Sequence, residues 1–345
     1  MGRDTINHAA NNPTSTSTSI TKTHSLGNWT TGSRNTIRNH FVVMTGEFLG
    51  TFLFLFFSFA PTQIAVIALK NEASTHPFVL DTSALLFVAA AFGVSVTVNV
   101  WAFYRINGGM LNPAVTLGLV LIGAVPPIRG LLVFPCQILA GIAAAGVVSA
   151  LFPGPLLVNV SLGAGTSIVQ GLFIEMFLTI QFLVVIFMLA VEKHRATFLA
   201  PIGIGMTLFV CHMTAVYYTG CGVNPARALG PDVVNASFPS YHWIYWLGPF
   251  MGAFVAAGIY KLFKMLCYET ANPGQDGGKE IVGLLYSDEE SALGARGEVD
   301  LRCFQVKRPV GEAREGTSER SGEDHPDSKF NHGVAAIRET GTEVK

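Results

Sequence analysis

Six long apolar stretches alternate with short polar connections along the chain. They cover roughly residues 41–60, 82–104, 129–152, 168–191, 197–218 and 241–266. A bilayer core about 30 Å thick requires about 20 apolar residues of helix, and each stretch is long enough to meet that requirement. The pattern therefore predicts an all-α membrane protein with six transmembrane helices.

Two further apolar segments, which follow Asn112 and Asn224, are too short to cross the membrane. Such segments are tolerated at membrane depth only where protein or a water-filled cavity covers them, so we expect two re-entrant half-helices. The stretch GEFLGTFLFLF (46–56) parallels IEMFLTIQFLV (174–184), and each leads on to an Asn-Pro-Ala. Three spans per half require the second copy to enter the membrane upside down. This inverted repeat is typical of channels and transporters.

The composition agrees with a membrane protein, since half of the 345 residues are apolar and only 13% are charged. Soluble domains have about a quarter of their residues charged. A net charge of -1 gives no support for nucleic acid binding. Five scattered cysteines argue against a metal cluster. The sequence shows no nucleophile paired with a base, so nothing in it indicates an enzyme. We expect no cofactor, no metal and no catalytic residue.

Charge also predicts the domain organisation and the orientation. Residues 1–40 and 267–345 are polar, so we expect disordered arms that flank a channel domain at 41–266. Basic residues in the short loops gather at one face, whereas the other face has only Lys70 besides Arg227. By the positive-inside rule both termini are then cytoplasmic. The basic loop residues are Arg105, Arg129, Lys193, Arg195, Lys261 and Lys264.

The two Asn-Pro-Ala sequences, Asn112-Pro113-Ala114 and Asn224-Pro225-Ala226, carry the candidate chemistry. Asparagine caps a helix through its side-chain oxygen, and proline at the first helical position loses a donor that had no partner. The amide NH2 group remains a donor for a passing oxygen. Two such helix N-termini that face each other place partial positive charge at the membrane centre, where it repels cations.

At this point the chain resembles the aquaporin family, through NGGMLNPAVT (107–116) and TGCGVNPARALG (219–230). The likeness covers roughly residues 41–266. It implies a six-helix bundle in the lipid bilayer whose two half-helices meet at the pore centre, and a homotetramer with one pore per subunit.

The resemblance also implies a constriction near the outer mouth, formed by Phe92, His212, Cys221 and Arg227, a quartet typical of strict water pores. Taken singly, each of the first three side chains is more typical of core packing, and it is their joint spacing that favours the constriction. Arg227 is a functional candidate on its own, because a charge at membrane depth is costly unless carbonyls or water hold it.

Glu47 and Glu175 occupy equivalent positions in the two repeats and are the acids inside apolar spans. An intramembrane carboxylate is a candidate proton carrier. Those spans contain no basic partner, however, and the resemblance implies that both acids brace the half-helix loops by hydrogen bonding. Gln137 and Gln181 are interpreted in the same way.

The expected function is a passive, osmotically driven water channel. Glycerol-conducting relatives typically have aspartate directly after the arginine, where this chain has Ala228, and lack an aromatic pair like Tyr245-Trp246. Asp232, at a position usually small in water channels, keeps a glycerol facilitator as the alternative. Hydrogen peroxide is close to water in size and polarity and is a further candidate permeant. An ion-coupled transporter and an adhesion protein are the other classes considered. The long polar termini resemble those of fungal water channels and suggest the plasma membrane.

Overall fold

The computed structural model describes the backbone of residues 26–73 and 82–272, and the side chains of residues 35–68 and 82–272. Within these ranges the protein is helical and has no β-strand, so the all-α prediction is confirmed. The α-helices are α1 (Leu26–Ala73), α2 (Thr82–Asn107), α3 (Pro113–Leu121), α4 (Pro127–Leu151), α5 (Ile168–Ile186), α6 (Ala200–Thr219), α7 (Pro225–Val234) and α8 (Ile244–Met265). The shorter elements are the π-helical turn η1 (Phe187–Val191) and the 3-10 turns η2 (Thr197–Leu199) and η3 (Tyr268–Thr270).

Six of the described helices are long and apolar enough to cross a membrane, which confirms the predicted number of spans. Their membrane-crossing segments are Asn35–Ala68, Thr82–Asn107, Pro127–Leu151, Ile168–Val191, Thr197–Thr219 and Ile244–Met265. The helices α3 and α7 are the two short ones, and they coincide with the predicted half-helices.

The predicted disordered arms are wrong where they meet the channel domain. Helix α1 already begins at Leu26, so residues 26–40 are helical. Those residues contain no proline that would stop a helix. Each residue added to an existing helix forms one further backbone hydrogen bond, so the helix can continue through them. At the other end, residues 267–272 form η3 and its flanks. The rest of the predicted arms, residues 1–25 and 273–345, lies outside the described residues.

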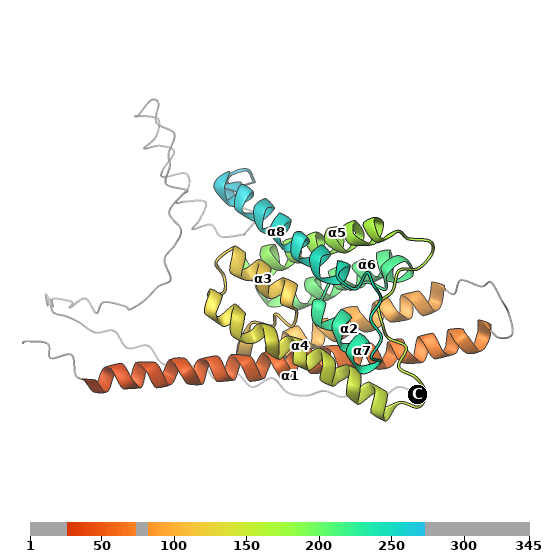
Figure 1. Ribbon diagram of the computed structural model, residues 1–345. Helices are drawn as coiled ribbons and strands as arrows, with labels where there is room; N and C mark the ends of the chain where they lie inside the picture. The colour runs from red at the N-terminus through yellow and green to blue at the C-terminus, as the bar shows by residue number, and fades with distance from the viewer. Residues whose placement is uncertain (1–25, 74–81, 273–345) are drawn as a thin grey trace, which may run out of the picture. The chain divides into compact units, whose positions relative to one another are not determined.

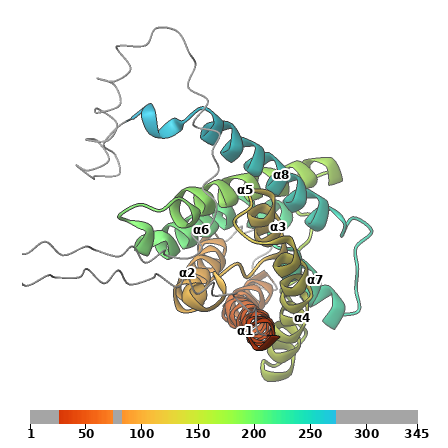
Figure 2. The ribbon, with the colours of Figure 1, turned by 90° about the vertical axis from the view of Figure 1, so that its left-hand side faces the viewer.

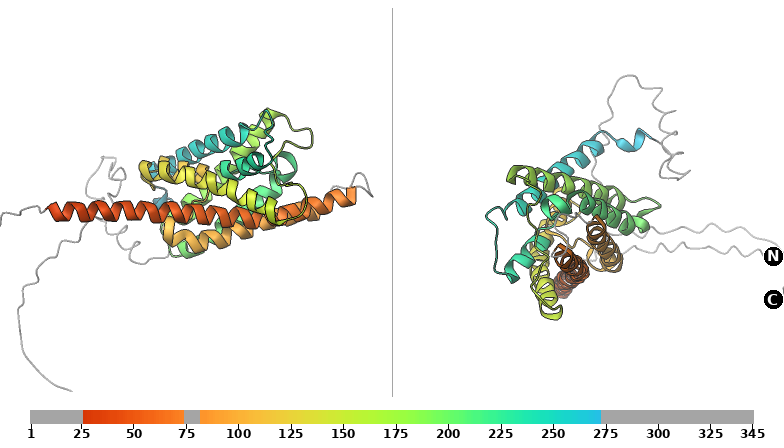
Figure 3. Two further views of the ribbon diagram at one scale, coloured as in Figure 1. Left: turned by 60° about the horizontal axis from the view of Figure 1, so that its bottom comes forward. Right: turned by 90° about the vertical axis from the view of Figure 1, so that its right-hand side faces the viewer.

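The contacts between helices in the first half of the chain have counterparts in the second half, as an inverted repeat predicts. Helix α1 packs on α2 and α4, as α5 packs on α6 and α8. Half-helix α7 packs on α4, as α3 packs on α8, while α2 contacts α6 and α3 contacts α7. Figure 1 shows α1 running along α4, and Figure 2 shows it end-on between α2 and α4. The turned views in Figure 3 show the same long α1 beside these helices.

The α2–α6 crossing depends on two glycines. A Cβ atom at Gly93 would lie 2.9 Å from the Gly205 carbonyl oxygen, and a Cβ atom at Gly205 would lie 2.6 Å from the Gly93 carbonyl oxygen. Small residues are enriched where membrane helices approach closely, because packing instead of the hydrophobic effect holds them together. This close crossing brings the side chains of α2 and α6 to the same cavity.

Candidate functional site

The half-helices begin at the two asparagines, as predicted. The Asn112 side chain accepts a hydrogen bond from the Ala114 backbone nitrogen at 2.8 Å. The Asn224 side chain accepts one from the Ala226 backbone nitrogen at 2.9 Å. Both have extended backbone, and proline occupies the first helical position of α3 and of α7. Local sequence alone explains this geometry.

The two asparagines also join the half-helices to each other. The Asn112 Nδ2 atom donates to the Val223 carbonyl oxygen at 3.1 Å, and the Asn224 Nδ2 atom donates to the Leu111 carbonyl oxygen at 3.0 Å. Leu111 and Val223 have φ angles of 51° and 55°, a left-handed backbone that few non-glycine residues adopt. Each amide nitrogen carries two hydrogens, so one remains for the lumen.

Glu47 and Glu175 hold the loops that precede the half-helices. Glu47 accepts from the backbone nitrogens of Met110 at 3.2 Å and Leu111 at 2.9 Å, and from the Gln137 side chain at 2.7 Å. Glu175 accepts from the backbone nitrogens of Gly222 at 2.8 Å and Val223 at 2.7 Å, and from the Thr219 hydroxyl at 2.6 Å. Both acids are fully buried. The sequence offered no signal for Thr219, which lies in an apolar helix.

Gln137 and Gln181 differ in their surroundings. Gln137 is buried and bonded to Glu47 and to the Thr116 hydroxyl, so it belongs to the brace around the first half-helix. Gln181 is exposed on α5. The sequence-based interpretation is therefore wrong for Gln181, since a helix in lipid also tolerates a glutamine on its outer face.

A narrow cavity runs between the half-helices and four long helices. It is lined by residues of α1, α2, α5 and α6, by both asparagines and by the arginine: Phe54, Phe92, Val96, Met110, Leu111, Asn112, Phe182, Leu208, His212, Gly222, Asn224 and Arg227. Several come in repeat pairs. Phe54 and Phe182 each follow a buried glutamate by seven residues, and Val96 and Leu208 each precede an asparagine by 16. Apolar side chains like these cannot be told from core residues by sequence pattern, except through the internal repeat.

One part of the cavity departs from this symmetry. The Phe92 ring stacks on the His212 ring with centroids 4.1 Å apart, and the Arg227 guanidinium lies 5.0 Å from the Phe92 ring centroid. The Arg227 Nη1 atom donates to the Val158 carbonyl oxygen at 2.6 Å. The structure thus brings Phe92, His212 and Arg227 together. Cys221 is fully buried beside the lining residue Gly222, but its side chain does not line this cavity.

Two buried nitrogen atoms of this group have no hydrogen-bond partner among the described protein residues. They are His212 Nε2 and Arg227 Nε. The His212 Nδ1 atom lies 2.9 Å from the Leu208 carbonyl oxygen, which fixes the ring orientation. Buried polar atoms are nearly always paired with protein or water. The cavity therefore offers hydrogen bonds to a small polar molecule between walls that are otherwise apolar.

Asp232, whose position raised the glycerol alternative, lies away from the cavity. It is fully buried and accepts hydrogen bonds from Asn159 and from His242, the latter at 2.6 Å. Asn159 in turn accepts from the Asn235 side chain at 2.6 Å. Asp232 therefore ties the end of α7 to the loop after α4 and to the start of α8. Among the described residues no group of three or more His, Cys, Asp or Glu side chains could hold a metal ion.

Comparison with known proteins gives three findings. The model of the major intrinsic protein family matches residues 36–260. The chain is 51% identical over 313 residues to Aquaporin-7 of Botryotinia fuckeliana, covering 89% of this chain and 65% of that protein. It is 55% identical over 243 residues to Aquaporin-1 of Gibberella zeae, covering 70% of this chain and 76% of that protein. The chain thus spans about two thirds to three quarters of the length of these relatives.

A solved structure shares the fold. It is the aquaglyceroporin from Plasmodium falciparum, which aligns with a TM-score of 0.54 over 64% of this chain and 95% of its own, at 20% identity.

Proposed function

Because the chain belongs to the major intrinsic protein family, whose members are membrane channels and not enzymes, we propose that it is a passive, osmotically driven water channel. The observation that carries the proposal is the group of Phe92, His212 and Arg227. The buried nitrogens His212 Nε2 and Arg227 Nε lack a hydrogen-bond partner. The third side chain, the Phe92 ring, lies beside both groups and narrows the cavity. This combination suits a permeant no larger than water.

The proposed selectivity filter consists of these three side chains, and Cys221, the fourth residue of the expected quartet, lies buried beside them. The stacked Phe92 and His212 rings take up the width that a carbon backbone such as that of glycerol would need. Arg227 is a full positive charge, and together with the N-termini of α3 and α7 it opposes the entry of cations. We assign the pore centre to the two Asn-Pro-Ala sequences, whose alanines, Ala114 and Ala226, are fully buried.

Hydrogen peroxide is proposed as a second permeant because it resembles water in size and in hydrogen bonding. The proposed assembly is a homotetramer in the plasma membrane. Its support is the wealth of exposed apolar side chains on α1–α2 and on α5–α6, two faces that the inverted repeat relates. A contact of one face with the other in a neighbouring copy is head-to-tail, and such a contact forms a ring when the rotation between copies closes. Examples of these side chains are Leu49, Phe57, Val94, Val98, Phe173, Phe177, Val210 and Met213.

Stopped-flow light scattering on vesicles that contain the full-length protein tests the proposal. Water permeability should exceed that of empty vesicles, and glycerol permeability should equal it. Equal acceleration of both solutes would replace the water channel by the glycerol facilitator. No acceleration of either would contradict a channel that is open under those conditions.

A further inference from the structure

Arg227 of the proposed selectivity filter is held by a segment without regular structure. Residues 155–163, between α4 and α5, form neither helix nor strand. Alternate side chains of this segment, those of Leu156, Val158 and Val160, are nevertheless buried. The Val158 carbonyl oxygen accepts the hydrogen bond from Arg227 Nη1 at 2.6 Å. The place of the guanidinium therefore depends on what fixes the backbone around Val158.

Gln63 of α1 fixes the segment just before Val158. Its Nε2 atom donates to the Pro155 carbonyl oxygen at 2.7 Å, and its Oε1 atom accepts from the Leu157 backbone nitrogen at 2.7 Å. The Gln63 side chain is buried, and both polar ends of its amide are paired with backbone groups. An extended segment makes no hydrogen bonds within itself, so buried side chains of this kind satisfy its backbone.

Asp232 and Asn235, at the end of α7, fix the segment just after Val158. The Asn159 Nδ2 atom donates to the Asp232 carboxylate, and the Asn159 Oδ1 atom accepts from Asn235 Nδ2 at 2.6 Å. Asp232 follows Arg227 by five residues on the same helix. One helix thus carries both the arginine and an anchor of the segment whose carbonyl binds that arginine.

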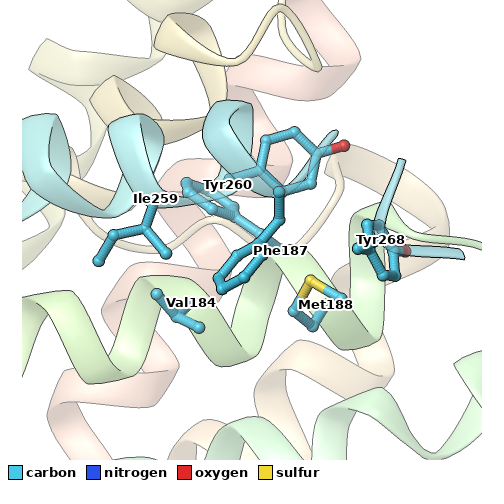
Figure 4. A pocket seen from close by; sticks show the side chains of 7 residues that line it. Val184, Phe187, Met188, Ile259, Tyr260 and Tyr268 are labelled. Carbon is cyan, nitrogen blue, oxygen red and sulfur yellow. The ribbon is translucent and has the colours of Figure 1, made fainter. Parts of the chain in front are cut away.

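The two ends of α8 differ in what they contact. Residues near its end line a groove together with the end of α5 and the turn η1, and this groove shares no lining residue with the channel cavity (Figure 4). Just before its start, His242 Nδ1 lies 2.6 Å from the second carboxylate oxygen of Asp232, and Trp246 Nε1 donates to His242 Nε2 at 3.1 Å. Because the Trp246 ring nitrogen can only donate, the proton of His242 is on Nδ1 and is donated to Asp232. Both oxygens of the Asp232 carboxylate are therefore engaged.

We propose that Asp232 and Gln63 are positioning residues of the selectivity filter. They hold the Val158 carbonyl, which in turn keeps the Arg227 guanidinium 5.0 Å from the Phe92 ring centroid. Neither Asp232 nor Gln63 lines the channel cavity. The inference rests on the proposed water channel, and it adds that the width of the filter is set from outside the lumen. When the segment is released, the guanidinium loses its carbonyl acceptor and moves away from the ring, which admits a wider solute.

An exchange of the two hydrogen-bonding side chains tests the role of Asp232. Asp232→Asn alone leaves one oxygen for the two donors on Asn159 and His242, and Asn159→Asp alone places two carboxylates face to face. In the double variant, the new amide at position 232 donates to the new carboxylate at position 159 and still accepts from His242. The double variant therefore restores each hydrogen bond at unchanged net charge.

Permeabilities are measured by stopped-flow light scattering on vesicles with equal amounts of folded full-length protein. Each single variant should raise glycerol permeability about threefold over the parent and keep water permeability within about twofold, because the filter widens while the asparagine donors stay. The double variant should return glycerol permeability to that of the parent, since the two changes are coupled through one hydrogen bond.

Gln63→Met tests the other anchor of the segment. The thioether fills about the same space as the amide but cannot replace the hydrogen bonds to Pro155 and Leu157, so glycerol permeability should again rise about threefold. Gln181→Met is the matched control. Gln181 is exposed on α5, so this variant should behave as the parent.

The outcomes separate this inference from the proposed function. Exclusion of glycerol by Asp232→Asn, Asn159→Asp and Gln63→Met would overturn the inference alone. A double variant that passes glycerol as the single variants do would also overturn it, because the restored hydrogen bond would then not hold the filter. Reduced water flux with glycerol still excluded would do the same, since the residues would then support the fold and not the width. Failure of the proposed function is seen in the parent itself, as absent water flux or as glycerol flux above that of empty vesicles, and the inference would then fail with it.

Discussion

At the scale of single residues, the asparagine amides divide their hydrogen bonds between structure and channel. The Oδ1 atom of each caps a half-helix, and one Nδ2 hydrogen reaches the loop of the other half. The second Nδ2 hydrogen is left for the lumen. In the proposed water channel, the donor that a passing water would meet is thus held in place by the same side chain's bonds to both halves.

Asn112→Asp should reduce osmotic water permeability per molecule at least about tenfold, which corresponds to roughly 1.4 kcal/mol in the barrier. The change removes the donor to the Val223 carbonyl and places an anion where two helix N-termini meet. Stopped-flow measurements on vesicles with equal amounts of protein check this. Asn39→Asp, on the exposed end of α1, should behave as the parent. Undiminished flux in correctly inserted Asn112→Asp protein would contradict the role of the amide.

The double change Phe92→Ala with His212→Ala should keep water permeability within about twofold and raise glycerol permeability about tenfold, since two stacked rings leave the constriction while the asparagine donors stay. Swelling of vesicles in water and glycerol gradients measures both. Phe254→Ala is the control, because that ring is 59% exposed on the outside of α8. If glycerol stays excluded from the double variant, the narrowest point lies elsewhere.

At the scale of elements, each half-helix depends on a carboxylate from a different helix. Glu47 of α1 binds the loop before α3, and Glu175 of α5 binds the loop before α7. A buried carboxylate that accepts three hydrogen bonds is expensive to leave unpaired. The loops before the half-helices are therefore fixed from outside, which allows left-handed backbone at Leu111 and Val223.

Gly93→Ala tests the α2–α6 crossing. The added methyl group would lie 2.7 Å from the Phe209 Cβ atom and 2.9 Å from the Gly205 carbonyl oxygen, so the two helices must separate. Overpacking of this kind costs about 1–3 kcal/mol. Denaturant unfolding in detergent should show this loss. Gly258→Ala, where nothing lies within 4 Å of the new methyl group, should unfold at the same denaturant concentration as the parent or at a slightly higher one. Equal stability of both variants would show that the crossing is not tight.

Glu192 predicts a pH dependence of stability at the end of α8. Its pKa in the folded protein lies below the ordinary value of 4.5, because hydrogen bonds from Tyr260 and Lys264 outweigh the effect of burial. A depressed pKa contributes stability above the unfolded value, and that contribution is lost as the pH falls through the folded pKa. The free-energy difference between the parent and Glu192→Gln should therefore be largest above pH 4.5 and shrink below it.

Denaturant unfolding in detergent at several pH values measures that difference. Glu269→Gln is the control for removal of a carboxylate, because the ion pair of Glu269 with Lys264 is exposed and contributes little to stability. A difference between the parent and Glu192→Gln that does not change with pH would show that Glu192 contributes through its shape and not through its charge.

At the scale of the whole molecule, a symmetric scaffold carries an asymmetric group of side chains. The helix pairs, the two acids and the two asparagines repeat, whereas Phe92, His212 and Arg227 form a single group in the cavity. The loop that supplies the Val158 carbonyl holds Arg227 in this group. The repeat therefore builds the cavity, and departures from the repeat supply the three side chains of the proposed selectivity filter.

Orientation is a prediction for the whole molecule. Epitope tags at either terminus should be accessible to antibody only after the cells are permeabilised, because six spans place both ends on the basic side of the membrane. A tag inserted after Gly165, an exposed position between α4 and α5, should be accessible in intact cells and serves as the control. A terminal tag that is accessible in intact cells would reverse the topology.

The sequence by itself determined the architecture of the described residues. Apolar length fixes the spans, because a helix in lipid must satisfy its own backbone and be about as long as the bilayer is thick. Asn-Pro at a helix start acts within a few residues, so the caps at Asn112 and Asn224 were readable. The internal repeat paired Glu47 with Glu175. All these signals are local or periodic.

Only the tertiary structure decided which distant groups meet. The Asn112 side chain donates to the Val223 carbonyl, and the Arg227 side chain donates to the Val158 carbonyl. Both acceptors are backbone atoms far away in the sequence, and a pattern of side chains cannot predict which backbone carbonyl a distant side chain will reach. Gln137 and Gln181 look alike in sequence, yet one is buried against Glu47 and the other is exposed, because the rotation of a helix in the bundle depends on its neighbours. Asp232 kept the glycerol alternative in the sequence, but packing places it against Asn159 and His242, since only the assembled bundle separates a lumen from a core.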